Sequence, residues 1–493
     1  MVKKVKVILV NIILILAMSL CGCYTNKPQV SDNSSALSVE KVMSTEMTVS
    51  KVESVPESVQ EPEPESEPLE VPTFEKTEVS LLMAGDVLCH KGVFTSGYYA
   101  DGTVNFDHIF ANTREDIEAA DLAIINQETM LGGKELELSG YPRFNSPFEI
   151  SDAIVNAGFD AVLFATNHTI DKGSAAVDNC LNYMKEHHPD TAVIGIHDAE
   201  FTDYSTQELY VYEKGGIKIA VLNYTYGTNG IANPEGRPLI VNRLDEEKIT
   251  MDVKKAKELA NFVVVCPHWG TEYVYKPTAA QKKWTELFYE LGVDLVIGAH
   301  PHVLENVEWI ESSDSDHKML VYYSLGNFIS TQDKKPRMIG GMAKVNIFLD
   351  KIENVEESLL KTNGGEIFTV EFPDEWKGRT FVKKEGLQDD ERGTEEDYYV
   401  IDGALTADGA AIAGLPAGTK EGDELVVFIN DASIEPVVCH RASGVGKITV
   451  YKLSDYTEAL AKKNLINRDD SGFTLDYIYD LCEEILGDWY ERP

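Results

Sequence analysis

The stretch Val293–His302 reads "VDLVIGAHPH", an apolar run that ends in two histidines one residue apart. A short apolar run of this kind is typical of a buried strand. The chain has 493 residues and only eleven histidines, yet it places two of them directly after this run. One interpretation is a polar loop. The other is a metal site, because imidazole is a common metal ligand.

Other apolar segments of the chain also end in polar side chains that a hydrophobic core does not need. "LLMAG" precedes Asp86, "LAIIN" precedes Gln127 and Glu128, "AVLFAT" precedes Asn167 and His168, and "FVVVCP" precedes His268. In open α/β sheets, ligands bind beyond the carboxyl ends of the strands. The pattern therefore predicts a single rim that gathers carboxylates, an amide and imidazoles.

This donor set indicates a particular class of metal. Oxygen and imidazole donors without thiolate favour Mn²⁺, Fe or Zn²⁺ over Ca²⁺. Two ions fit the pattern, because one carboxylate can bridge a pair about 3.5–4 Å apart. Singly, Asp86 and Asn167 also suit a helix cap or a turn. His90 either faces the metals or shapes the loop, and Asp171 is placed to orient His168 in an acid–base relay.

From Val79 onward, short apolar segments alternate with amphipathic ones. Helices are predicted over residues 151–158, 174–187, 247–260 and 278–292, where apolar residues recur every three or four positions. The alternation is typical of an α/β fold with a largely parallel, buried sheet. Within residues 210–224, "YVYEKGGIKIAVLNY" predicts an antiparallel hairpin.

The first 23 residues predict export. Lys3, Lys4 and Lys6 precede an apolar run that is shorter than the roughly 20 residues needed to span a bilayer, which is typical of a signal peptide. The run ends in Leu20–Cys23, "LCGC", which resembles a bacterial lipoprotein box with Cys23 as the lipidated residue. We therefore expect an exported chain that is lipid-anchored to the outer face of the bacterial cell membrane.

Composition divides the rest of the chain into four parts. Residues 24–78 are rich in Ser, Pro and Glu, which predicts a disordered acidic linker. Residues 79–350 form the predicted main domain, 351–434 an insertion or small β subdomain, and 435–493 a C-terminal segment that packs on the core and is helical from Leu453. The remaining five cysteines are scattered, so they predict small buried hydrophobes rather than a disulfide framework. The net charge of −38 argues against nucleic acid as a partner.

Together the motifs resemble a known family. In this order they are "GDVLCH", "NFDHIF", "NQETM", "YPRFNSP", "AGFDAVLFATNHTIDKG", "NYTYGTNGI", "CPHWGTEY", "GAHPHVLE" and "YYSLGNFIS", followed by "GGM". They resemble the CapA family of bacterial poly-gamma-glutamate capsule synthesis proteins over residues 79–344. The resemblance implies a calcineurin-like metallophosphoesterase fold, a four-layer α/β/β/α sandwich of mixed sheets with a dimetal centre.

The resemblance also implies roles for single residues. The implied metal ligands are Asp86, Glu128, Asn167, His268, His300 and His302. His168 resembles the acid that protonates a leaving group. Phosphoesterases of this superfamily usually begin with Asp-x-His, whereas Leu88 stands at the histidine position here, and Glu128 replaces the second Asp. One metal position is therefore expected to be weak, empty or completed by His90.

Three functions follow as hypotheses. The first is a cell-surface lipoprotein of capsule synthesis, transport or anchoring, with a metal-dependent hydrolase-like site that acts on or guides an anionic polymer such as poly-gamma-glutamate. Other capsule synthesis proteins are candidate partners in this hypothesis. The second is an extracellular metal-dependent phosphoesterase. The third is a polymer-binding module without catalysis, so the sequence leaves open whether the chain is an enzyme.

Overall fold

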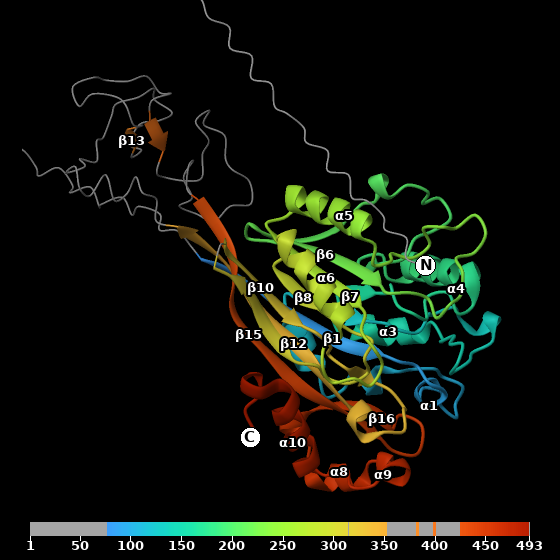
Figure 1. The fold of residues 1–493 in the computed structure, drawn as a ribbon. Helices are drawn as coiled ribbons and strands as arrows, with labels where there is room; N and C mark the ends of the chain where they lie inside the picture. Colours follow the sequence, from blue (N-terminus) through green and yellow to red (C-terminus); the bar gives the residue numbers. More distant parts are fainter. Residues whose placement is uncertain (1–75, 314, 353–380, 384–397, 401–423, 493) are drawn as a thin grey trace, which may run out of the picture. The chain divides into compact units, whose positions relative to one another are not determined.

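A computed structural model describes residues 76–313, 315–352, 381–383, 398–400 and 424–492 (Figure 1). The predicted signal peptide, nearly all of the predicted linker, and most of the predicted insertion over 351–434 lie outside these residues. Among the described residues, no helix is both long enough and apolar enough to cross a bilayer.

Most strands belong to two mixed sheets. The first has eight strands in the order β16-β15-β12-β1-β2-β3-β4, with β11 beside β1; the second has six in the order β5-β6-β7-β8-β10-β9. Their bounds are β1 Thr77–Val87, β2 Leu122–Asn126, β3 Ala161–Leu163, β4 Ala192–Ile194, β5 Tyr210–Lys214, β6 Ile217–Thr225, β7 Phe262–His268, β8 Leu295–Ile297, β9 Val307–Ser312, β10 Ser315–Tyr322, β11 Asn327–Ile329, β12 Ile339–Ile352, β15 Glu424–Arg441 and β16 Ile448–Lys452. β13 Phe381–Lys383 and β14 Tyr398–Val400 pair separately.

In the first sheet the parallel strands extend to the β4 edge and the antiparallel pairs lie on the β16 side, whereas in the second sheet the parallel strands are central and both edge pairs are antiparallel. Strands β1 to β4 are mutually parallel, as are β6, β7, β8 and β10. The predicted hairpin over residues 210–224 is confirmed, because β5 pairs antiparallel with β6. Parallel strands end on the same edge, so the residues after them are brought to one side of each sheet.

Alternation along the strands builds two cores. In β7, Val264 and Cys266 belong to the large core cluster that includes residues of the first sheet. Val263 and Val265 belong to a second cluster with residues of α5 and α6. Because successive side chains of a strand point to opposite faces, β7 is covered on both sides. The Cys266 Sγ lies 3.7 Å from the Met83 Sδ of β1, so the two sheets pack face to face.

The predicted helices are confirmed within two residues at each end. The helices are α1 Lys91–Thr95, α2 Arg114–Ala119, α3 Glu149–Asn156, α4 Gly173–His187, α5 Glu246–Leu259, α6 Ala279–Glu290, α8 Glu458–Lys463, α9 Ile466–Asp469 and α10 Leu475–Leu486. Helix α6 begins with a capping box, in which the Thr278 hydroxyl accepts from the Gln281 N–H and the Gln281 side chain accepts from the Thr278 N–H. Helices α5 and α6 cover the outer face of the second sheet (Figure 1).

The C-terminal part of the chain completes the first sheet. β15 pairs with β12 along its length, so residues 424–434, which were assigned to the predicted insertion, belong to this sheet. Helices α8 to α10 follow β16, as predicted, and Ile466 and Ile478 lie buried in the main core. The expected fold class, a mixed α/β fold with two sheets and a helical tail, is confirmed. The five cysteines after residue 78 are free and buried, as predicted.

Candidate metal centre

Acidic and imidazole side chains meet where strands of both sheets end. Asp86 lies near the end of β1, and Glu128 lies two residues after β2. His268 is the last residue of β7, and His300 and His302 follow β8. All five side chains are buried. With Asn167 they form what we call the candidate metal centre.

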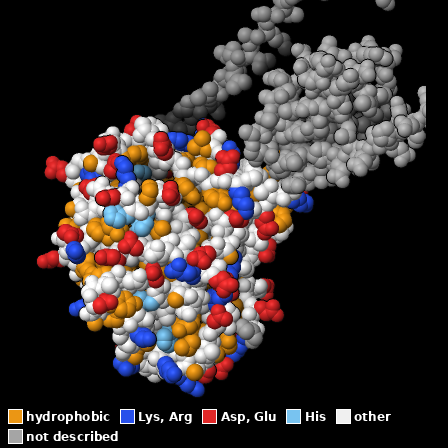
Figure 2. Space-filling model, turned by 180° about the vertical axis from the view of Figure 1, so that it is seen from behind, with side chains coloured by type: hydrophobic (Ala, Val, Ile, Leu, Met, Phe, Trp, Pro, Cys, Tyr) orange, Lys and Arg blue, Asp and Glu red, His pale blue; other side chains and the backbone are white. Residues whose placement is uncertain are grey.

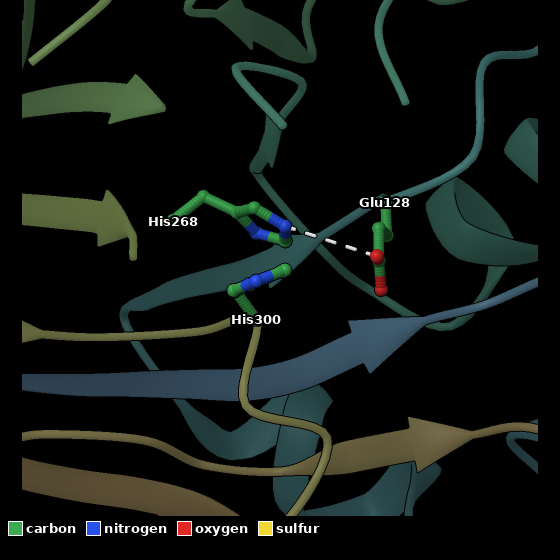
Figure 3. A group of neighbouring side chains, drawn as sticks. All are labelled: Glu128, His268 and His300. Carbon is green, nitrogen blue, oxygen red and sulfur yellow. Dashed lines mark ion pairs between the residues drawn. The ribbon is translucent and has the colours of Figure 1, made fainter. Parts of the chain in front are cut away.

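Three of these side chains form the His268 group, which consists of Glu128, His268 and His300 (Figure 3). One possible ligand atom of each lies within 4.8 Å of the others. The His268 Nε2 is 3.8 Å from the Glu128 Oε1 and 3.0 Å from the Asn167 Oδ1. Asn167 therefore adds a fourth donor on the side of His268.

Three side chains form the His302 group, which consists of Asp86, Glu128 and His302, again with ligand atoms within 4.8 Å. The His302 Nδ1 is 3.3 Å from the Asp86 Oδ2 and 3.5 Å from the Glu128 Oε2. The Asn126 amide donates to the Asp86 Oδ1 at 2.7 Å, which holds that carboxylate. The two Glu128 oxygens thus face different groups, as a bridging carboxylate requires.

The unsatisfied atoms fit a cation. Both oxygens of Glu128 and the Nδ1 of His300 are buried and have no hydrogen-bond partner among the described residues. A buried polar atom in this condition costs about 1–3 kcal/mol, and more if it is charged. Divalent cations satisfy such atoms by coordination. The donors also fit Mn²⁺, Fe or Zn²⁺, since they combine imidazole with carboxylate oxygen.

The electrostatics of the centre point the same way. Burial, together with the Asp86 carboxylate, raises the pKa of Glu128 well above its usual range. Burial, together with neighbouring imidazoles, lowers the pKa values of His268 and His300 well below the usual range, so both are neutral at pH 7. Neutral imidazole is the form that binds metals. Burial opposes the charged form of His302, but the carboxylates of Glu128 and Asp86 outweigh it and raise its pKa to about 9. These carboxylates therefore stabilise a positive charge at this position.

The backbone around the histidine doublet is strained. His300 and His302 have φ angles of 101° and 59°, in the left-handed region that residues other than glycine rarely adopt. The His300 N–H donates to the Asp86 Oδ2 at 3.2 Å, which holds the turn against β1. Strain of this kind persists where the surrounding structure fixes it, and it clusters at functional sites.

His168 and Asp171 form a pair beside the centre, as the sequence predicts. The His168 Nδ1 is 2.7 Å from the Asp171 Oδ2. The same oxygen accepts from the Phe144 N–H at 2.8 Å, and the Phe144 ring packs edge-on against the imidazole. The carboxylate thus holds one ring nitrogen and leaves the His168 Nε2 for another partner.

The structure brings the six sequence-predicted ligands together, and their role as ligands stays a prediction. His90 contributes no atom to either group. Its ring packs edge-on against Phe144 at 5.3 Å, and its buried Nδ1 has no hydrogen-bond partner in the part of the chain that the structure describes. Burial and the neighbouring His302 lower the pKa of His90 to about 4.

Asn327 is a candidate ligand that sequence reasoning missed. It begins β11, which pairs with β1 so that Asn327 lies opposite Asp86. Its Nδ2 donates to the Gln332 Oε1 and to the Arg337 carbonyl, both at 3.0 Å, so its Oδ1 faces the other way, 3.1 Å from the His302 Nδ1. Asn327 lies within the quoted "YYSLGNFIS" motif, but a single amide after a glycine gives no signal of its own.

Two tyrosines lie against the histidine doublet. The Tyr226 ring lies 4.7 Å from the His300 ring, and the Tyr273 ring lies 5.9 Å from the His302 ring. The Arg337 guanidinium stacks over Tyr273 at 3.5 Å. Both tyrosines are more than a third exposed, so they extend from the buried histidines to the protein surface.

Comparison with solved structures finds low overall similarity. The chain resembles a Haemophilus influenzae NAD nucleotidase with a TM-score of 0.35 and 10% identity over 56% of this chain and 48% of that one. It resembles a Thermus thermophilus 5'-nucleotidase precursor with a TM-score of 0.34 and 14% identity over 55% and 51%.

Sequence comparison identifies closer relatives. The chain is 27% identical to the capsule biosynthesis protein CapA of Bacillus anthracis over 275 residues, which are 52% of this chain and 61% of that protein. It is 30% identical to the PGA biosynthesis protein CapA of Bacillus subtilis over 176 residues, 35% of this chain and 43% of that protein. The match therefore spans about half of each relative. The family model described as bacterial capsule synthesis protein PGA_cap matches residues 80–332. The chain belongs to this family, the CapA family of capsule synthesis proteins.

Proposed function

We propose that this chain is a capsule synthesis protein whose candidate metal centre holds two divalent metal ions and acts on an anionic polymer. The observation that carries the proposal is Glu128, whose two oxygens accept no hydrogen bond from the described residues and each face a separate donor group. The His268 group with Asn167 would hold one ion, and the His302 group the other. Bound there, Mn²⁺, Fe or Zn²⁺ would polarise a bond and supply activated water.

His168 is the proton donor in this proposal. In the doubly protonated ring the Nδ1–H donates to Asp171 at 2.7 Å, and the Nε2–H is the proton that would pass to a leaving group. The imidazole lies next to Asn167 in the chain and is nearly buried, which keeps water away from the transfer. Deep burial of the carboxylates and imidazoles strengthens each electrostatic contact they make.

The polymer and the location come from the relatives and the N-terminus. A relative is named for PGA biosynthesis, which supports poly-gamma-glutamate as the polymer. The lipoprotein box at Cys23 supports attachment to the outer face of the cell membrane, where other capsule synthesis proteins are candidate partners. The mass of the mature chain tests this part, since lipidation at Cys23 removes 22 residues and adds acyl chains.

A metal-dependent phosphoesterase is the second candidate, and the His168–Asp171 pair favours it equally. The full-length chain, loaded with Mn²⁺, is assayed on γ-linked glutamate oligomers and on aryl phosphate esters. The substrate class that is hydrolysed decides between the two candidates. If the chain binds metal and oligomer but hydrolyses neither substrate, the result supports the third hypothesis, a polymer-binding module without catalysis.

Replacement of His168 by Gln lowers the rate on the true substrate by about 100-fold or more, because general acid catalysis contributes at least that much. Metal content stays unchanged, since His168 belongs to neither donor group. His187→Gln on the exposed face of α4 is the matched control and retains full rate. A His168→Gln variant that turns over at the wild-type rate removes this residue from the mechanism.

Replacement of Asn327 by Ala lowers the affinity of the His302 group for its ion about 10-fold, because one neutral oxygen donor is lost. Binding of the other ion stays unchanged. Asn327→Asp restores or exceeds wild-type affinity, because it keeps the oxygen and adds charge. Metal titration followed by elemental analysis reads out both ions. Equal affinities in all three proteins would show that Asn327 only positions His302.

A further inference from the structure

A second polar feature lies next to the candidate metal centre. It is an open pocket of about 540 Å³ on the loop that follows β6. The backbone of Arg243 forms a bridge with Thr225 at the end of β6, so the pocket lies at the same strand ends as the centre. We call it the Arg243 pocket, and its lining consists of Gly227, Thr228, Gly230, Ile231, Ala232, Asn233 and Arg243.

One loop connects this pocket to the centre. Asn229 lies between two residues of the lining, and its side chain reaches the other way. Its Nδ2 lies 3.5 Å from the His168 Nδ1, and its Oδ1 accepts from the Asn167 amide at 3.3 Å. Tyr226, at the start of the loop, contacts His300. A ligand held at the centre therefore has the Arg243 pocket as a direct neighbour.

Arg243 is exceptional among the partly buried arginines that the structure describes. The others, Arg114, Arg237, Arg337 and Arg441, each pair with a carboxylate. Arg243 has no carboxylate partner among the described residues. Its guanidinium donates to neutral groups alone, the Thr228 and Asn233 side chains, and its Nε is buried without a partner.

An uncompensated, partly buried cation is costly, and in this chain carboxylates are abundant. Acidic residues outnumber basic ones by 82 to 44, and Figure 2 shows Asp and Glu side chains spread over the face it presents. Such a surface repels an anionic polymer at long range. A site with one local, unpaired guanidinium supplies the attraction that the surface as a whole does not.

We propose that the Arg243 pocket is a subsite for a carboxylate of the polymer, next to the unit held at the candidate metal centre. Both protons of its Nη2 are donated to Thr228 and Asn233, so the Nη1 is the atom that would donate a charge-assisted hydrogen bond to a carboxylate. Thr228 and Asn233 hold the guanidinium in place by accepting from its Nη2 at 2.8 and 2.7 Å. The identity of the polymer rests on the proposed function, whereas the anion subsite rests on Arg243.

The test is binding of a γ-linked glutamate tetramer to the full-length, Mn²⁺-loaded chain, measured by calorimetry at low and at physiological salt. Arg243→Gln weakens binding about 10-fold, as expected for one charge-assisted contact. Arg468→Gln removes the same charge from an exposed site on α9 and leaves binding unchanged. A tetramer amidated at its carboxyl groups binds weakly to the wild type, and its affinity for Arg243→Gln is the same as for the wild type.

A second variant leaves the hydrogen bonds of Arg243 intact. Ala232 is exposed in the lining, so Ala232→Glu adds a competing carboxylate at the pocket without touching the loop contacts. It weakens tetramer binding at low salt by several-fold more than Ala232→Gln does, because the two side chains have the same size and differ in charge. Thermal unfolding and metal content are measured for every variant, so a misfolded loop is recognised.

Wild-type affinity for the tetramer in both Arg243→Gln and Ala232→Glu overturns the subsite, whatever the metal content is. If Arg243→Gln weakens binding of glycerol phosphate more than binding of the tetramer, the ligand group of the subsite is a phosphate and the choice of a carboxylate is overturned. A wild-type chain that retains no metal after loading with Mn²⁺ refutes the metal centre instead. Elemental analysis gives this result independently of tetramer binding. The two proposals therefore fail by different measurements.

Discussion

Glu128→Gln abolishes metal binding at both positions of the centre, with affinities lower by about 1,000-fold or more, and activity falls with them. Outer contacts to metal ligands already change affinity 10–100-fold, and this substitution alters a donor shared by two ions. Gln retains the size of the side chain and one oxygen but loses the negative charge. The Asp86 and Glu128 carboxylates then no longer act together on the His302 group.

The measurement is elemental analysis after dialysis, with two ions per wild-type chain and fewer than about 0.2 per variant chain as expected from that loss of affinity. Glu305→Gln is the matched control. Glu305 is also fully buried and lies three residues after His302, but it belongs to neither donor group and instead accepts from the Gln281 amide at 2.6 Å. Two ions retained by Glu128→Gln would contradict the bridging role, and the proposed function with it.

The convergence of the centre could be predicted from the sequence because it depends on local patterns. Each short apolar run marks a strand, and each polar residue after it marks a carboxyl end. Parallel pairing then brings these ends to one edge without further information. The strands β2 and β7 have the predicted positions, and Glu128 and His268 meet as expected.

The arrangement of strands in sheets could not be predicted in the same way. Which strands share a sheet depends on long-range pairing, and the pattern of one strand does not encode its partner. The strands β12 and β15 pair with each other across about 70 intervening residues, and no strong hydrophobic period marks that part of the sequence. The segment over 424–434 was therefore assigned to an insertion, although it extends the first sheet.

Asn327 and Arg243 escaped prediction for a related reason. Each depends on a partner that is distant in sequence or on the absence of one. Asn327 lies opposite Asp86 through a strand pairing that joins β11 to β1. Arg243 stands out because none of the residues that the structure describes places a carboxylate beside it, and a sequence cannot show which charges remain unpaired. The hydrogen-bond partners of a single amide or guanidinium are known only once the three-dimensional structure is known.

Gly298→Ala destabilises the fold by about 3 kcal/mol or more and weakens metal binding in the molecules that remain folded. A Cβ at this position would lie 2.1 Å from the Tyr323 carbonyl oxygen and 2.4 Å from the Trp269 Nε1. These two atoms are hydrogen-bonded to each other at 2.9 Å, and both residues are buried. Overpacking of this kind costs about 1–3 kcal/mol, and more where backbone must move.

The displaced backbone is the one that carries the histidine doublet. Gly298 bonds to Tyr322 through its N–H at 2.7 Å, and His300 follows two residues later with a strained φ. Any shift of the strand end therefore moves His300 away from Glu128. Gly227→Ala is the control: its Cβ meets no atom within 4 Å and its φ is negative, so stability changes by less than about 0.5 kcal/mol. Chemical denaturation measures the free energy of unfolding of both variants. A Gly298→Ala protein as stable as the wild type would show that the strand end accommodates a methyl group. Full metal affinity in that protein would further mean that the position of the doublet does not depend on this close packing.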